Sequence, residues 1–338
     1  MNKTTVGCLL AALVVALILS VGFNMLQSFA LMGQAVSGMM EAKETLTEKV
    51  EVAGKSGAAD KIIHLDLEGI ISSMSMGGIF ESAMPSLDTI KRGLEQAVVD
   101  KDVKAIVLRI NSPGGEVTAS DTLYAAVKKA AAKKPVVVHM DSVAASGGYY
   151  VACGATKVVA SETTLTASIG VIMESMSYHE LFGKVGLGSQ TFTSGAFKDT
   201  LSGARPMRED EKAYVQALVD TMYDRFLGIV SEARKVPKDM LKAGVADGRV
   251  VTGRQALEAK LVDQIGYIED AYALAKELGK APDATVVKYQ TTPSLMSVLG
   301  LTAKRAQAPA KVELDLTGGA LPKLQPGLMY YLPGSFLR

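Results

Sequence analysis

The sequence predicts an α/β fold in which helices cover a parallel sheet, preceded by a transmembrane helix. From about residue 61 apolar strands alternate with helices, and this order requires crossover connections between parallel strands. The 338-residue chain is 48% hydrophobic and 21% charged, which is enough apolar material for a large core. Its 36 basic and 35 acidic residues form no long block of one sign, so nucleic acid is not expected as a partner.

An apolar segment stands near the start of the chain. Residues 6–23 read VGCLLAALVVALILSVGF, and 18 residues rising about 1.5 Å each nearly cross a hydrocarbon core of about 30 Å. We therefore expect residues 1–30 to be a membrane anchor. The long run favours an uncleaved anchor over a signal peptide cut after residues 28–30. Because Lys3 and the terminal amine precede the run, the positive-inside rule predicts a cytoplasmic N-terminus and an exported body.

The next segment, residues 31–60, is expected to be a tether or amphipathic linker. It is mixed in charge and ends in GKSGAAD at 54–60, a composition typical of a domain boundary. The globular body is then expected over residues 61–290.

Within the body, the strands are short apolar runs and the helices are longer periodic segments. Runs of this kind are typical of strands buried on both faces of a sheet. Strands are predicted over 62–71, 105–110, 136–140, 157–161 and 285–289, and helices over 87–99, 118–133, 148–153, 208–235, 238–242, 253–259 and 268–278.

The helix predicted over 208–235 carries an apolar stripe, which we interpret as core packing. The stripe consists of Tyr214, Leu218, Met222, Phe226 and Ile229.

The tail, residues 291–338, contains several prolines but ends in the apolar sequence LMYYLPGSFL. Disorder remains an alternative, but the apolar end favours docking on the body or on a neighbouring subunit. Its end is a candidate for a product-like or regulatory segment in a groove.

Cysteine and histidine patterns predict no metal and no cofactor. Cys8 and Cys153 lie in very different surroundings, so no disulfide is expected between them, and Cys153 is interpreted as a small buried hydrophobe. The spacing of His64, His139 and His179 does not fit a zinc site.

The segment VVVHMDSVAASGG, residues 136–148, predicts a sharp turn from a strand into a helix. Such a turn places Ser146 on a corner with its backbone N–H pointing outward, as a nucleophile requires. Ala144 stands where the usual elbow pattern has its first glycine. A serine that serves only as a helix N-cap is the alternative.

A second loop could supply an oxyanion site. The segment NSPGG, residues 111–115, follows one strand and opens a helix, where free N–H groups gather. Paired backbone N–H groups of Gly114 and Ser146 would form a two-donor oxyanion hole. The same segment could equally be a plain turn.

The spacing of residues in the sequence does not identify the general base for Ser146. His139 and Asp141 lie in or beside the strand that feeds the turn and can hardly fold back over it, and His64 and His179 remain formal candidates. Lys198 lies in TSGAFKD among small and aromatic neighbours. A lysine base requires a pKa far below about 10.4, which burial in an apolar site can achieve.

Several segments together carry a resemblance to a known family. They are VKAIVLRINSPGGEVTAS, VVVHMDSVAASGGYYVA, TLTASIGVI, GAFKD and VADGRVVTGRQALEAKLVDQIG, in this order over roughly residues 62–278. In this order and spacing they closely resemble the signal peptide peptidase A family of membrane-bound serine peptidases, in its short, single-repeat form.

The resemblance implies a crotonase-like or Clp-like fold and a Ser/Lys dyad. It implies that Ser146 is the nucleophile, Lys198 the general base, Ser168 a residue that helps to hold the lysine, and Gly114 a donor of the oxyanion hole. Ala167 stands where the family usually has a glycine. The family also implies a homo-oligomer with active sites at protomer boundaries.

We therefore expect a membrane-anchored serine endopeptidase that degrades released signal peptides and similar apolar peptides. Its partners would be peptide substrates and the lipid bilayer, with the catalytic domain on the periplasmic or extracellular side of the cell membrane. The alternatives are a crotonase-type acyl-CoA enzyme, in which loop N–H groups polarise a thioester, and a membrane scaffold without catalysis.

Overall fold

The computed structural model describes residues 20, 23, 27, 46–73, 87–291 and 329–331. Most of the predicted anchor and most of the predicted tail lie outside these residues. In the part of the chain that is described, no helix is long and apolar enough to cross a membrane.

Strands and helices alternate along the body. The strands are β1 (Leu46–Val52), β2 (Lys61–Ile71), β3 (Val103–Glu116), β4 (Val136–Ala145), β5 (Lys157–Ala160), β6 (Leu165–Ala167), β7 (Val250–Thr252), β8 (Gln264–Ile265), β9 (Thr285–Thr291) and β10 (Tyr330–Tyr331). The helices are α2 (Leu87–Val99), α3 (Val117–Ala131), α4 (Gly147–Ala152), α5 (His179–Lys184), α6 (Glu209–Arg234), α7 (Lys238–Ala243), α8 (Gly253–Glu258) and α9 (Ile268–Leu278).

The described strands form one sheet whose main order is β1-β9-β2-β3-β4-β5-β8. All neighbours along this path are parallel except β1 and β9. Leu65 of β2 lies beside Leu108 of β3, which lies beside Val138 of β4. The predicted α/β class with a parallel sheet is therefore confirmed.

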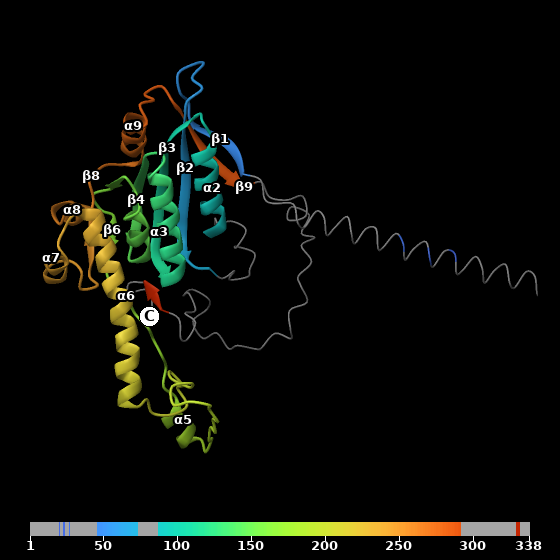
Figure 1. Ribbon diagram of the computed structural model, residues 1–338, viewed down its shortest axis with the longest axis vertical. Helices are drawn as coiled ribbons and strands as arrows, with labels where there is room; N and C mark the ends of the chain where they lie inside the picture. The colour runs from blue at the N-terminus through green and yellow to red at the C-terminus, as the bar shows by residue number, and fades with distance from the viewer. Residues whose placement is uncertain are drawn as a thin grey trace, which may run out of the picture. The chain divides into compact units, whose positions relative to one another are not determined.

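Helices cover both faces of this sheet, and α2 and α3 lie side by side in front of the strands in Figure 1. On one face α2, α3, α4 and the C-terminal half of α6 share a core with Leu108 and Val138. On the other face α9 packs against Val107 and Val137. Because successive side chains of a strand point to opposite faces, an unbroken apolar run fills both cores.

One expectation for the linker was wrong. Residues 46–52, which we expected inside the tether at 31–60, form β1 and pair with β9, with Val50 opposite Val287. The segment LTEKVEV is a charged edge strand, and charges at a sheet edge discourage pairing with other chains. The folded body therefore begins before residue 61.

The stripe on α6 is only partly core. Phe226 and Ile229 are buried, but Tyr214 is 48% exposed. The C-terminal half of α6 packs on the body, whereas the N-terminal half runs away from the sheet toward α5 (Figure 1).

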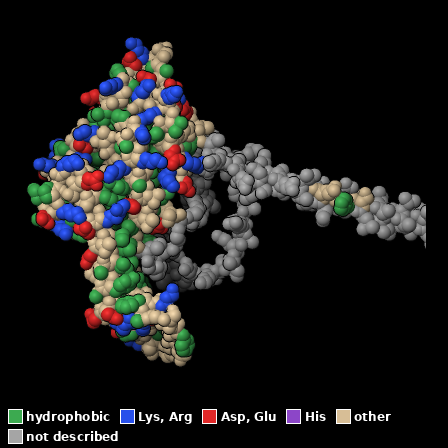
Figure 2. All heavy atoms as spheres, in the orientation of Figure 1, with side chains coloured by type: hydrophobic (Ala, Val, Ile, Leu, Met, Phe, Trp, Pro, Cys, Tyr) green, Lys and Arg blue, Asp and Glu red, His purple; other side chains and the backbone are tan. Residues whose placement is uncertain are grey.

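We call residues 173–220 the arm. It comprises α5, the loop after it and the N-terminal half of α6, and Figure 2 shows hydrophobic side chains gathered over this part of the molecule. Exposed apolar side chains gathered in this way are typical of an interaction surface. The exposed large apolar residues of the arm are Met176, Tyr178, Leu181, Val185, Leu187, Phe192, Phe197 and Tyr214.

A partly buried ion pair fixes the C-terminal end of α6 to the sheet. Asp263 accepts a hydrogen bond from Arg234 Nη1 at 3.0 Å and one from the backbone N–H of Val158, in β5, at 2.8 Å. The Arg234 side chain is 12% exposed, and its Nε also donates to the carbonyl oxygen of Lys260 at 3.0 Å.

Asp263→Ala should lower the free energy of unfolding by about 2 kcal/mol, because Arg234 Nη1 loses its carboxylate partner and a strand N–H loses its acceptor. Urea denaturation followed by circular dichroism measures the change. Asp247→Ala is the matched control, since it removes a carboxylate paired with Arg249 at the surface, and it should leave stability unchanged. Equal effects of the two substitutions would contradict this role of Asp263.

Candidate active site

Ser146 occupies the corner between β4 and α4. Its backbone has φ 52° and ψ −112°, a conformation that L-residues rarely adopt, and the residue is 1% exposed. Its side chain makes no capping hydrogen bond to α4, so the structure does not support the N-cap alternative. A strained serine between a strand and a helix is the arrangement of a nucleophile elbow.

The corner is held by strand β6. The Ser146 N–H donates to the carbonyl oxygen of Ala167 at 2.7 Å, and the Ser168 N–H donates to that of Arg249 at 2.9 Å. Ala167 and Ser168 have φ values of 60° and 49°, in the region that favours glycine. Ala167 therefore adopts a glycine-like conformation where the family usually has a glycine, and Ser168 lies directly beside the corner.

One of the two N–H groups expected to form the oxyanion hole is hydrogen-bonded within the chain. The Ser146 N–H is already used by Ala167, so it is not free for a ligand. A Cβ placed on Gly114 would lie 2.7 Å from the backbone nitrogen of Gly147, so these two residues face each other. Gly147 begins α4, and the first N–H of a helix has no acceptor within that helix.

The Gly114 N–H donates to Ser112 Oγ at 3.1 Å, and Gly114 itself has φ 111°. An oxyanion is a stronger acceptor than a neutral hydroxyl, so a developing negative charge would compete well for this N–H.

Two hydroxyls at the corner stand out. Among the described residues, the buried Ser146 Oγ and Ser120 Oγ have no hydrogen-bond partner. A Cβ placed on Gly147 would lie 2.5 Å from Ser120 Oγ, so Ser120 of α3 packs against the start of α4. Buried polar atoms without partners are rare and often mark functional sites. Sequence analysis missed Ser120, because only the packing of α3 on α4 brings it here.

The histidines are placed elsewhere. His139 lies on the face of β4 that is covered by α9, where burial lowers its pKa. His64 contacts Asp66 and Tyr272 on that face. His179 lies in the arm, with Nδ1 2.8 Å from Ser177 Oγ. Since Ser146 Oγ has no partner in the described residues, none of these imidazoles is placed as its base.

Lys198 lies in the arm, exposed to solvent. Its neighbour Phe197 packs on Tyr214 of α6, whereas Tyr150, one turn after Ser146, packs on Phe226 of the same helix. Twelve residues of α6 separate these two contacts, or about 18 Å along the helix axis. Within one chain the structure therefore does not bring Lys198 to Ser146.

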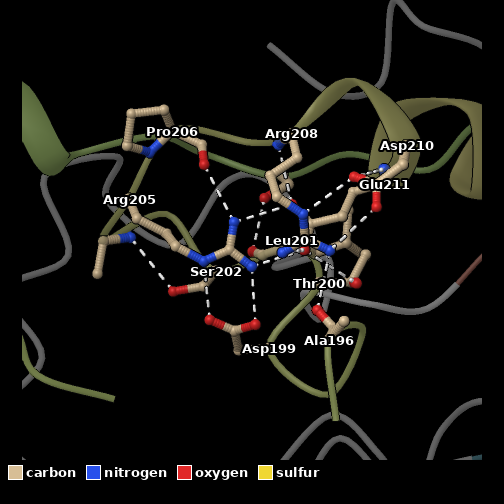
Figure 3. A network of polar contacts seen from close by, with 12 residues as sticks. Ala196, Asp199, Thr200, Leu201, Ser202, Arg205, Pro206, Arg208, Asp210 and Glu211 are labelled. Atoms are coloured by element: carbon tan, nitrogen blue, oxygen red, sulfur yellow. Dashed lines mark hydrogen bonds and ion pairs between the residues drawn. The ribbon is translucent and has the colours of Figure 1, made fainter. Parts of the chain in front are cut away.

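A network of ion pairs fixes the loop that carries Lys198 (Figure 3). Arg205 donates to both carboxylate oxygens of Asp199, at 2.8 and 2.7 Å, and to both of Glu211, at 2.8 and 2.6 Å. Arg208 donates to the carbonyl oxygen of Ala196 at 2.9 Å. The backbone is thus tied to α6 on both sides of Lys198, and Asp199 is paired with Arg205.

Arg205 and Arg208 also stabilise the ionised form of Glu211, whose side chain has no solvent exposure. The guanidinium of Arg205, with a further contribution from the Arg208 N–H, holds the pKa of Glu211 at about 2. Glu211 is therefore a stable anion at the first turn of α6, where the helix dipole also favours negative charge.

The tail reaches the same corner. Tyr330 and Tyr331 of β10 pair antiparallel with Glu116 and Gly115 at the end of β3. On its other side Tyr330 exchanges two backbone hydrogen bonds with Ile172, each of 3.1 Å. The part of the apolar tail that is described is therefore docked on the body, next to the loop that holds Gly114.

Known peptidases are similar to the chain over the residues described above. The model of Peptidase family S49 matches residues 128–281, and that of Clp protease matches residues 75–169, a range that includes both Gly114 and Ser146. The chain is 34% identical to an Enterococcus faecium protein named as a signal peptide peptidase, SppA, over 97% of this chain and 96% of that protein.

Two further relatives are named as proteases. A protease of Synechocystis is 36% identical over 68% of this chain and 78% of its own length, and Protease 4 of Salmonella typhi is 36% identical over 63% of this chain and 34% of its own length. The chain therefore belongs to the signal peptide peptidase A family of serine peptidases, peptidase family S49.

Proposed function

We propose that the protein is a membrane-anchored endopeptidase that degrades released signal peptides and similar apolar peptides, with Ser146 as nucleophile and Lys198 as general base. The observation that carries the proposal is the strained corner at Ser146, whose buried hydroxyl has no partner among the described residues and lies beside an extended peptide segment. Family membership supports the reaction class.

The proposed reaction passes through an acyl-enzyme. Ser146 Oγ attacks the peptide carbonyl carbon while the neutral amine of Lys198 takes its proton, and the negative oxygen is bound by the N–H groups of Gly114 and Gly147. The lysine then gives the proton to the leaving amine, and water hydrolyses the ester. Ser168, beside the corner, would hold the lysine amine in place.

We further propose that Lys198 comes from a neighbouring copy of the chain. The arm carries this lysine away from its own Ser146, its loop is held firmly by Arg205, and its apolar side chains are exposed. Docking the arm on a second body would cover these side chains and strip water from the amine. Both changes favour the neutral base that the reaction needs.

The membrane setting rests on the apolar residues 6–23, which lie mostly outside the described residues. A single anchor with a cytoplasmic N-terminus would hold the catalytic body on the exported side of the cell membrane. Apolar peptides left in the bilayer would be presented to it there.

Ser146→Ala and Lys198→Ala should each abolish hydrolysis of an apolar quenched peptide by the detergent-solubilised chain. When the two variants are denatured, mixed in equal amounts and refolded together, activity should return to roughly a quarter of the wild-type value. Random assembly gives that share of sites one intact serine and one intact lysine from different copies.

Each variant refolded alone is the control and should stay inactive, with circular dichroism showing the native fold. If both variants fold but their mixture stays as inactive as each variant alone, then either Ser146 and Lys198 act within the same chain or they do not form a dyad. Either result would contradict the proposal.

Arg205→Ala should lower kcat at least tenfold with little change in KM, because the loop that presents Lys198 loses its anchors on Asp199 and Glu211. Arg205→Lys should recover little, since an ammonium cannot serve both carboxylates in the same geometry. Arg249→Ala, which removes an exposed arginine paired with Asp247, is the matched control. A change confined to KM would contradict a positioning role.

The ion pairs between Arg205 and Glu211 should still hold the loop of the arm at moderately acidic pH. Because the pKa of Glu211 is lowered from 4.5 to about 2, its stabilising contribution is present above pH 4.5 and is lost as the pH falls toward 2. Amide exchange in residues 195–211 should therefore stay slow at pH 4, after correction for intrinsic rates, and accelerate near pH 2. Amide exchange in this segment that is already fast at pH 4 would contradict a lowered pKa of Glu211.

A further inference from the structure

The part of β3 that carries Gly114 lies beyond two irregularities of the sheet. Between two of its pairs with β2, β3 advances three residues, from 111 to 114, while β2 advances two, from 68 to 70. Between two of its pairs with β4, β3 advances two residues, from 110 to 112, while β4 advances four, from 140 to 144. Bulges of this kind bend a strand and interrupt its ladder. Contacts other than the regular ladder must therefore help to fix Gly114.

Glu116 makes side-chain contacts across this irregular region. Its carboxylate accepts hydrogen bonds from Ser72 Oγ at 2.8 Å, from Ser73 Oγ at 2.5 Å and from the Ser73 N–H at 3.1 Å. The two serines directly follow β2, and Glu116 is the last residue of β3. The carboxylate thus ties the ends of β2 and β3 together, two residues after Gly114.

The Glu116 side chain serves this tie and not the helix that follows it. Glu116 is the N-cap of α3, yet its side chain makes no capping hydrogen bond. The residue is 8% exposed, and burial alone would raise its pKa, but the hydrogen bonds from Ser73 and Ser72 lower the pKa below its ordinary value. A carboxylate anion therefore stands here at neutral pH, and its charge strengthens each of these hydrogen bonds.

The end of β2 lies directly against the oxyanion loop. Ile71 pairs with Gly115, and a Cβ placed on Gly115 would lie 1.9 Å from the Ile71 carbonyl oxygen. Gly114 in turn faces the backbone nitrogen of Gly147, 2.7 Å from a Cβ placed on Gly114. Because backbone touches backbone at both contacts, a shift of the end of β2 would move Gly114 relative to Gly147.

We propose that Glu116 is a positioning residue of the oxyanion hole: by holding Ser72 and Ser73, its carboxylate fixes the Gly114 N–H opposite that of Gly147. The inference rests on the proposed function and adds a residue to the same site. Donors of an oxyanion hole must point at the place where negative charge develops, and they contribute mainly in the transition state. Loss of the tie should therefore act on kcat more than on KM.

The first test is Glu116→Gln, which keeps the size of the side chain but replaces one acceptor oxygen by an NH2 group that cannot accept from Ser73. With the full chain in detergent and an apolar quenched peptide, kcat should fall at least tenfold and KM should stay within about twofold. Glu162→Gln, which changes an exposed carboxylate paired with Arg254, is the matched control and should alter neither value. A change confined to KM in a natively folded Glu116→Gln chain would overturn the proposal.

A second test reads the oxyanion hole itself. An apolar peptide aldehyde forms an adduct with the nucleophilic serine whose oxygen occupies the oxyanion hole, whereas a peptide amide of the same sequence does not react. Glu116→Gln should raise the inhibition constant of the aldehyde about tenfold and leave that of the amide unchanged. Equal weakening of both inhibitors would mean that general peptide binding is lost, and it would overturn the positioning role.

A third variant keeps the proposal testable should Glu116→Gln fold poorly. Ser73 is exposed, so Ser73→Ala should leave folding intact, and it should lower kcat about threefold because the carboxylate loses one of its donors. Combined with Glu116→Gln it should cause no further loss, since the hydroxyl acts through the carboxylate. Losses that multiply in the double variant would overturn this route.

Amide exchange separates this inference from the proposed function, because it does not depend on catalysis. Exchange in residues 111–116 should be at least tenfold faster in Glu116→Gln than in the wild type. Faster exchange together with hydrolysis that does not depend on Ser146 would overturn the proposed function alone. Hydrolysis that depends on Ser146 together with an unchanged kcat in Glu116→Gln would overturn the positioning role alone.

Discussion

The hydrogen bond from the Ser146 N–H to the Ala167 carbonyl oxygen is the contact on which the site depends. It fixes the backbone of Ser146 at a positive φ, a conformation that would otherwise be unfavourable by about 1–3 kcal/mol. Ala167 and Ser168, at the end of β6 that pairs with the end of β4, also have positive φ values. The hydrogen bond to Ala167 also uses the Ser146 N–H, which leaves the first N–H of α4 to face Gly114.

The structure places the two residues of the proposed dyad in different parts of the chain. The body holds a buried hydroxyl, two glycine-rich loops and a peptide-like strand, whereas the arm holds a lysine on a loop clamped by Arg205. Under the proposed mechanism neither part completes an acyl transfer alone, because the serine needs the lysine to take its proton. Assembly of copies would then be a condition for catalysis as well as for burial of the apolar arm, and a free chain would be inactive.

Much of the body could be predicted because its signals are local. The run VVVHM and the Ser-Gly-Gly turn predict a strand, a corner and a helix, and the structure places them at β4, Ser146 and α4. Longer-range features could not be predicted. β1 was missed because its charges are equally typical of a linker and only pairing with β9 reveals it, and the use of the Ser146 N–H depends on β6, about twenty residues later. The separation of Lys198 from Ser146 follows from the straight course of α6, which a stripe of apolar residues does not reveal.

The most direct test of the nucleophile is chemical labelling of the detergent-solubilised chain. A peptide inactivator that reacts with activated serines and carries an apolar peptide is added, and the modified residue is mapped by mass spectrometry. We expect one adduct, on Ser146, which forms in the wild-type assembly and not in the Lys198→Ala chain. An adduct on another serine, or equal labelling of Ser146 without the lysine, would contradict a hydroxyl at this corner activated by that amine.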